Sequence, residues 1–161
     1  MADWADVARQ APELAPQVQE RFDAYGLALI ATLRRDGGPR ISGIETLFAN
    51  DQLWLGMMPD SLKARDLLRD ARFELHSATT DKMVTNGDAR IIGRAEPVSD
   101  EATFGAFRAA FEAHTGYPPP EGPFQLFRAN VREIFMLRPA GDHLALDFWI
   151  EGKGLQHVDR Y

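Results

Sequence analysis

The segment "GLALIATLRRDGGPRISGIETLFANDQLWLGMM", residues 26–58, determines the expected fold of this chain. It consists of short apolar runs rich in Ile, Leu, Phe and Trp, separated by "RDGGP" and "ANDQ", whose residues are typical of turns. We therefore expect three antiparallel strands, near Leu27–Arg34, Arg40–Ala49 and Leu53–Met58. Strands that follow one another through short turns favour an antiparallel sheet.

Helices are expected before and after these strands. A helical segment at residues 3–25, interrupted by Pro12 and Pro16, precedes them. A short helix at Leu62–Arg69, capped by Asp60 or Ser61, follows them.

A second helix begins after Ser99 or Asp100 and ends near Gly116. Its phenylalanines recur at helical spacing, as a core-facing side requires, and they are Phe104, Phe107 and Phe111. A stiff loop rich in proline, Thr115–Pro123, comes after this helix.

The remaining segments either alternate apolar and polar residues or are continuously apolar, as strands are. They are residues 72–79, 88–99, 124–139 and 143–154. Gly93, inside one of them, predicts a bulge or a close approach of another backbone. No composition shift divides the chain. The expected fold class is therefore mostly β with flanking helices: a single domain over residues 1–161, with six to seven antiparallel strands forming a barrel.

Composition narrows the function classes. Lys and Arg total 18 against 24 Asp and Glu, so the formal net charge of −6 disfavours nucleic acid as a partner. The absence of cysteine excludes disulfides and thiolate chemistry and fits a reducing cytoplasm. No apolar run approaches the roughly 20 residues that span a bilayer, so no membrane association is expected.

Several common catalytic patterns are missing from the sequence. There is no P-loop, no HExxH pair and no GxSxG elbow. The "GKG" at Gly152–Gly154 lacks the third glycine and the following helix of a dinucleotide-binding turn. The four histidines are scattered, so no metal site is expected, and they are His76, His114, His143 and His157.

An anion site is the chemistry that the residues do support. The free N–H groups at the start of the helix at Leu62–Arg69 favour negative charge, and Ser61 and Lys63 stand beside them. Arg40 opens the strand after the "DGGP" turn and reaches the same anion if the strands fold back as expected. The alternative is that Ser61 is only a cap and Lys63 a solvated surface residue.

Three stretches together resemble the pyridoxamine 5'-phosphate oxidase-like superfamily, the flavin-binding split barrels. They are "LALIATLRRDGGPRISGIE", "LWLGMMPDSLKARDLLRDARFELHS" and "GDARIIGRAEPVSD". The matching features are the Asp-Gly turn with Pro-Arg entry to a strand, Ser-x-Lys at a helix start, and the two strands that follow, in the family's order. The match covers about residues 27–100.

The resemblance implies a cofactor, either flavin mononucleotide (FMN) or the deazaflavin coenzyme F-420, whose phosphate is held by Arg40, Ser61 and Lys63. It also implies a homodimer with sites at the interface, the partner contributing near Trp149. The backbone residues expected along the ribityl chain and ring are Ile41, Ser42, Gly43, Ile44, Met57 and Met58. No catalytic residue is identified.

The sequence also departs from the oxidase proper. Leu62 stands where the oxidase has an arginine, Asp88 near a glutamine position, and Met57 and Met58 where polar residues stand. The C-terminal Arg-x-His is not reproduced around His157. We therefore expect a flavin-type oxidoreductase acting on a small organic substrate other than vitamin B6. The alternative is a non-catalytic cofactor- or haem-binding protein, a carrier or sensor, on the same barrel.

Overall fold

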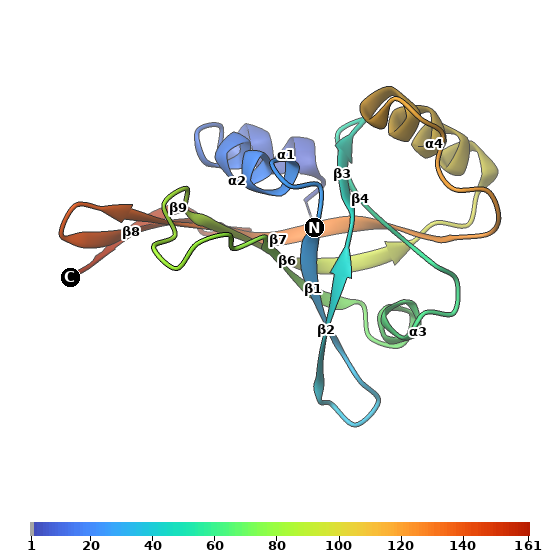
Figure 1. Cartoon of the computed structure of the whole chain (residues 1–161), viewed down its shortest axis with the longest axis horizontal. Helices are drawn as coiled ribbons and strands as arrows, with labels where there is room; N and C mark the ends of the chain where they lie inside the picture. Colours follow the sequence, from blue (N-terminus) through green and yellow to red (C-terminus); the bar gives the residue numbers. More distant parts are fainter. Residues whose placement is uncertain (1) are drawn as a thin grey trace.

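The computed structural model describes residues 2–161, which form a nine-stranded antiparallel sheet with four helices packed around it (Figure 1). The strands are β1 (Ala28–Leu33), β2 (Pro39–Ile44), β3 (Thr46–Ala49), β4 (Gln52–Met57), β5 (Arg72–Ser77), β6 (Asp88–Pro97), β7 (Gln125–Ala140), β8 (His143–Ile150) and β9 (Gly154–Arg160). The helices are α1 (Trp4–Gln10), α2 (Leu14–Asp23), α3 (Leu62–Arg69) and α4 (Glu101–Thr115). The fold is thus mostly antiparallel β with flanking helices, as predicted.

The strand order explains the barrel shape. Seven strands follow one another as β2-β1-β5-β6-β7-β4-β3, so the two end strands, β2 and β3, are neighbours in sequence with only Glu45 between them. The sheet must therefore curl until its two ends meet, yet no backbone ladder joins β2 to β3. This is a split barrel, open at the junction of β2 with β3.

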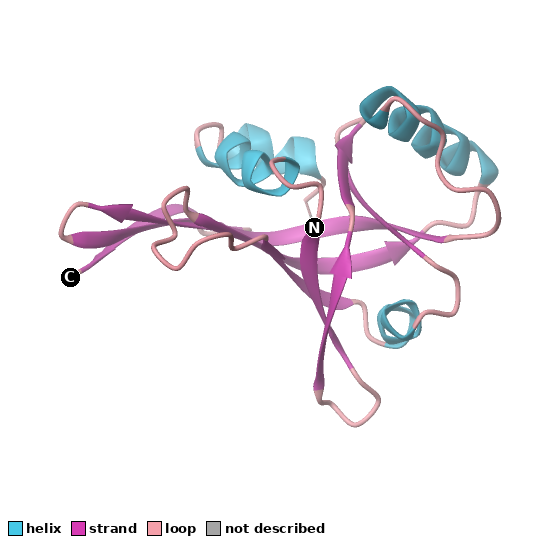
Figure 2. Cartoon of the chain, in the orientation of Figure 1, coloured by secondary structure: helices cyan, strands magenta, loops and turns pink. Residues whose placement is uncertain are grey.

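β7 connects the barrel to an extension. Its 16 residues pair with β4 near their start and with β8 near their end. The β8–β9 hairpin consequently projects from the barrel and carries the C-terminus away from it (Figures 1 and 2).

The barrel itself contains seven strands, within the predicted six to seven, and the described sheet has nine because two segments expected as single strands each form two. The segment Arg40–Ala49, expected as one strand, is two, because β2 pairs with β1 whereas β3 pairs with β4. The segment 143–154, also expected as one strand, runs from β8 into a turn and then β9. Gly152 and Gly154 take positive φ angles of 78° and 76° there, so "GKG" is hairpin-turn chemistry.

The turn and bulge predictions are confirmed. The loop between β3 and β4 consists of Asn50 and Asp51, both at positive φ, as a two-residue hairpin requires. The register of β6 against β7 shifts between Ile92 and Gly93, and a Cβ on Gly93 would lie 2.4 Å from the carbonyl oxygen of Asn130. Gly93 thus marks both a bulge and a close backbone approach.

The N-terminal segment 3–25 forms two helices rather than one interrupted helix. Asp3 caps α1, and α2 starts at Leu14 with Pro16 in its first turn, where proline loses no hydrogen bond. Both helices pack onto the barrel, and their buried side chains join the main core, as Trp4 and Phe22 show through ring contacts with Phe48.

The other two helices begin and end as predicted. Ser61 caps α3 and Asp100 caps α4, each accepting a hydrogen bond from a backbone N–H in the first turn. Gly116, at φ 80°, ends α4 in the left-handed conformation. No helix in the described part of the chain is both long and apolar enough to cross a membrane.

Candidate functional site

The start of α3 lies against β2, where the sequence places its anion site. The Ser61 hydroxyl accepts from Ala64 N–H at 3.3 Å, and Arg65 N–H donates to the Ser61 carbonyl at 3.0 Å. The N–H groups of Leu62 and Lys63 precede the first intrahelical bond and have no helical acceptor. This helix terminus therefore offers two backbone donors and partial positive charge.

A buried carboxylate fixes Arg40 in place. Asp66 of α3 has only 4% of its side chain exposed, and it accepts hydrogen bonds from Arg40 Nε at 2.6 Å, Thr32 Oγ1 at 2.9 Å and Arg69 at 3.0 Å. Burial alone would raise the pKa of Asp66, but these donors outweigh it and hold the pKa below its ordinary value. α3 is thereby joined to both β1 and β2.

The geometry of Arg40 leaves donors for a ligand. Its Nε is used by Asp66, whereas its two Nη groups make no hydrogen bond within residues 2–161. The side chain is 19% exposed, so solvent or a bound anion can reach it. Guanidinium donors of this kind suit phosphate oxygens.

Lys63 reaches across to the same strand. Its Nζ donates to the Gly43 carbonyl at 2.7 Å, three residues along β2 from Arg40. Burial lowers the pKa of Lys63, and within residues 2–161 no carboxylate pairs with it. A partly desolvated ammonium without an acidic partner is stabilised by an incoming anion.

The local charge is positive although the whole chain is acidic. Arg40 and Arg69 both pair with the Asp66 carboxylate, and Lys63 bonds the Gly43 carbonyl, so three cations at these contacts meet one carboxylate. The structure therefore places Arg40, Ser61 and Lys63 on adjoining elements, β2 and the start of α3.

The other predicted contact residues differ in exposure. Ile41, Gly43 and Met58 are exposed, Ser42 is half-buried, and Ile44 and Met57 are buried. β2 also approaches β4, so these backbone segments lie near one another.

Trp149 lies inside the protein rather than on its surface. Its side chain is fully buried in the main core, and its Nε1 has no hydrogen-bond partner there. The indole therefore offers no surface for direct contact with a cofactor, and a contribution of a partner subunit near Trp149 stays a prediction. The burial follows from the β7–β8 pairing, in which Trp149 faces the barrel opposite Ile134.

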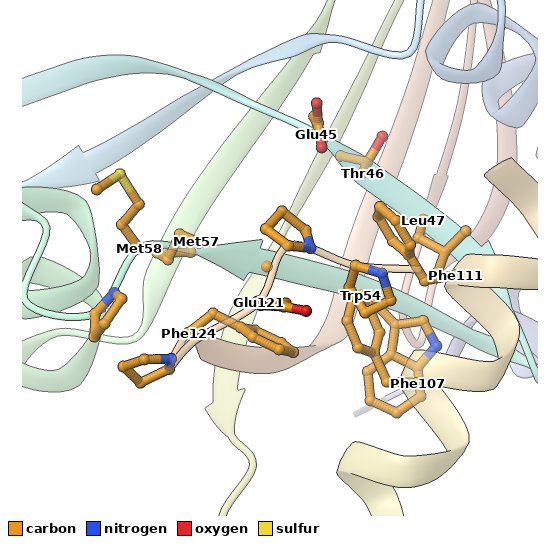
Figure 3. Close-up of a pocket in the computed structure, with 15 residues that line it drawn as sticks. Glu45, Thr46, Leu47, Trp54, Met57, Met58, Phe107, Phe111, Glu121 and Phe124 are labelled. Atoms are coloured by element: carbon orange, nitrogen blue, oxygen red, sulfur yellow. The ribbon is translucent and has the colours of Figure 1, made fainter. Parts of the chain in front are cut away.

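A cavity of about 530 Å³ opens at the surface of the protein (Figure 3). It lies between the β3–β4 hairpin, α4 and the loop that follows α4. Met57, Met58 and Pro59 line one end of it, and Ser61 comes two residues later in the chain.

The sequence reasoning missed this cavity. Phe107 and Phe111 were expected as ordinary core, and Phe107 is indeed buried in a second, smaller cluster with Trp54. Both rings nevertheless also form a wall of the cavity. The proline run in the loop after α4 was the available signal, because stiff loops with several prolines can hold a fixed wall.

Within residues 2–161, no group of three or more His, Asp or Glu side chains has an arrangement that could hold a metal ion.

Comparison with known proteins identifies the family. The family profile described as pyridoxamine 5'-phosphate oxidase matches residues 14–138. The chain belongs to this family. No curated protein sequence matches this family member.

Solved structures similar to this family member share its fold at low identity. ChuZ from Campylobacter jejuni is 15% identical, with a TM-score of 0.68 over 89% of this chain and 61% of that one. PhzG from Burkholderia lata 383, solved in complex with tetrahydrophenazine-1-carboxylic acid, is 19% identical, with a TM-score of 0.60. The match covers 96% of this chain and 85% of PhzG.

A Clostridium acetobutylicum protein of the pyridoxinephosphate oxidase family is 12% identical, with a TM-score of 0.59. The match covers 88% of this chain and 90% of that protein. At such identities the likeness shows the fold alone. The split barrel of a pyridoxamine 5'-phosphate oxidase family member is therefore established, and its chemistry has to be argued from the site.

Proposed function

We propose that this protein binds the phosphate of FMN between β2 and the start of α3, and that it is a flavin-dependent oxidoreductase acting on a small organic substrate. The family supports a flavin-type cofactor, with the deazaflavin coenzyme F-420 as the alternative. A cytoplasmic location belongs to the same proposal.

The observation that carries the proposal is the state of Lys63. Its ammonium is half-buried, its pKa is lowered by burial, and it has only a carbonyl partner, on Gly43. Arg40 stands nearby on β2 with both Nη groups unused. A phosphate at the α3 terminus would accept from both cations and from the free N–H groups.

The chain's own residues would bind and orient rather than react. Lys63, Arg40 and Ser61 would hold the phosphate, and the backbone at Met57 and Met58 would border the ring. A bound flavin or deazaflavin supplies the hydride-transfer chemistry. The apolar cavity next to these methionines would exclude water from a substrate.

Removing Lys63 tests the proposal directly. The Lys63→Ala variant should weaken FMN binding about 10- to 150-fold, because a hydrogen bond to a charged group contributes about 1.5–3 kcal/mol. Quenching of flavin fluorescence on titration measures the affinity. Arg65→Ala is the matched control, since Arg65 lies two residues along the same helix, is exposed, and contacts Asp60 instead of β2.

Equal FMN affinity in the Lys63→Ala variant and the unchanged protein would contradict the phosphate assignment. The absorption spectrum of the purified protein, and of what denaturation releases, separates the cofactors. A haem spectrum would replace the flavin proposal with the carrier or sensor alternative. Leu62, an exposed residue where the oxidase has an arginine, is the observation that favours weaker cofactor binding of that kind.

A further inference from the structure

We infer that the cavity beside α4 is a substrate compartment for arylalkylamines: molecules with a flat apolar ring system and one cationic nitrogen. The role of the ligand as a substrate rests on the proposed function. The binding of the ligand to the cavity does not depend on it. The inference stands on the lining of the cavity, on its charge and on its position.

The walls of the cavity are apolar and largely aromatic. Four rings and several prolines and aliphatic side chains surround it, and they are Trp54, Phe107, Phe111, Phe124, Pro119, Pro120, Pro123, Leu47, Met57 and Met58. The rings pack on one another at centroid distances of 5.5–5.9 Å. A volume of about 530 Å³ lies in the range of small-molecule pockets.

The charged groups of the cavity are both acidic. Glu45, between β2 and β3, and Glu121, on the loop after α4, line it, and among the described lining residues no Lys or Arg balances them. Both carboxylates are exposed side chains and project from different walls of the cavity (Figure 3). A cationic ligand is therefore favoured over an anionic one.

The aromatic rings add to this preference. The negative faces of Trp and Phe rings attract cations, most strongly where water is excluded. Arg108 already lies 5.9 Å from the centroid of Phe124, and it pairs with Glu101 outside the cavity. The protein's own cation thus occupies one aromatic face without entering the compartment.

The position of the cavity suits a substrate. Met57 and Met58 border both the cavity and the proposed path of the cofactor ring, and the phosphate site begins at Ser61. The cationic phosphate site and the acidic compartment are thus separate regions of opposite charge. An anionic cofactor and a cationic substrate would each be directed to its own region.

A matched pair of ligands tests the inference. 1-Naphthylmethylamine and 1-naphthoate share one ring system and differ in charge at pH 7, and isothermal titration calorimetry measures both, with and without added FMN. The amine should bind at least about tenfold more tightly than the carboxylate. The double variant Glu45→Gln/Glu121→Gln should lose most of this preference, retain the smaller part that the rings supply, and still bind the amine weakly.

Two further variants locate the binding. Phe111→Ala should weaken the binding of both ligands alike, because it removes part of one wall. Glu112 is an exposed residue of α4 outside the lining, so Glu112→Gln should change the affinity for neither ligand. Equal binding of amine and carboxylate, or a preference that the double variant leaves undiminished, would overturn the inference. So would the absence of binding by either ligand. If the amine binds as expected but FMN does not, the compartment stands and the flavin proposal fails.

Discussion

Asp66 determines the geometry of the proposed phosphate site, although it would not touch the ligand. We predict that Asp66→Asn lowers the free energy of unfolding by about 2–4 kcal/mol, because Arg40 loses a buried charged partner. The variant should also bind FMN more weakly, since the Arg40 guanidinium is no longer held in orientation. Urea unfolding and flavin titration measure the two effects.

The pH dependence of this effect has a defined sign. The pKa of Asp66 is below its ordinary value of 3.8 in the folded protein, so its stabilising contribution is present above about pH 4 and is lost as the pH falls through the folded pKa. The stability difference between Asp66→Asn and the unchanged protein should therefore narrow in acid. Asp70→Asn, which removes an exposed pair with Arg72, is the control and should leave stability nearly unchanged. A difference that widens in acid would contradict the assigned role of Asp66.

At this scale the sequence predicted the residues that could face a ligand, but not the residue that positions them. Ser61 and Lys63 stand at a recognisable helix start, and Arg40 follows a recognisable turn. Asp66 reads locally as one half of an exposed pair with Arg69, three residues later. Its partners Thr32 and Arg40 lie 34 and 26 residues away, so only the folded sheet reveals its burial.

Among the elements, the β6–β7 ladder depends on a single glycine. A Cβ at Gly93 would approach Asn130 O to 2.4 Å and Phe73 to 3.0 Å, so Gly93→Ala must displace backbone. We predict a loss of about 2–4 kcal/mol in the free energy of unfolding, in the range of severe core substitutions. Thermal and urea unfolding measure it.

The same substitution in α4 should have the opposite sign. Gly105 has open space around its Cβ position and lies inside a helix, where alanine is favoured over glycine by about 0.8–1 kcal/mol. Gly105→Ala should therefore stabilise the protein. If Gly93→Ala proves as harmless as Gly105→Ala, the close approach of β6 to β7 is wrong.

The element boundaries show why some predictions held and others did not. α3 and α4 carry their own capping residues, so local sequence was sufficient. The break at Glu45 has no turn signal, because it arises from a change of pairing partner between β2 and β3. The β8–β9 turn at 151–153 is not evident from the sequence, because "GKG" has the composition of a phosphate-binding turn as well as of a strand reversal.

For the molecule as a whole, the outer face of the β1–β2 hairpin is unusually apolar. Leu27, Leu29 and Ile41 are 53%, 47% and 70% exposed. Leu29 pairs with Gly43, and Ala31 with Ile41, so these side chains share one face of the sheet. We propose that this face joins two copies of the chain, which agrees with the homodimer implied by the family resemblance.

We predict that the purified protein has a mass of about 36 kDa in solution, twice the 18.0 kDa of the chain, when measured by light scattering. Leu29→Lys should convert it to the monomer, because a buried ammonium without a partner opposes association. Met83→Lys is the control, since Met83 is also exposed but lies in the loop before β6, away from the β1–β2 face. A dimer that survives Leu29→Lys, or one that Met83→Lys disrupts equally, would place the interface elsewhere. β2 carries both Ile41 of this face and Arg40 of the phosphate site. If a second copy of the chain completes the site, the monomeric Leu29→Lys variant should therefore also bind FMN more weakly.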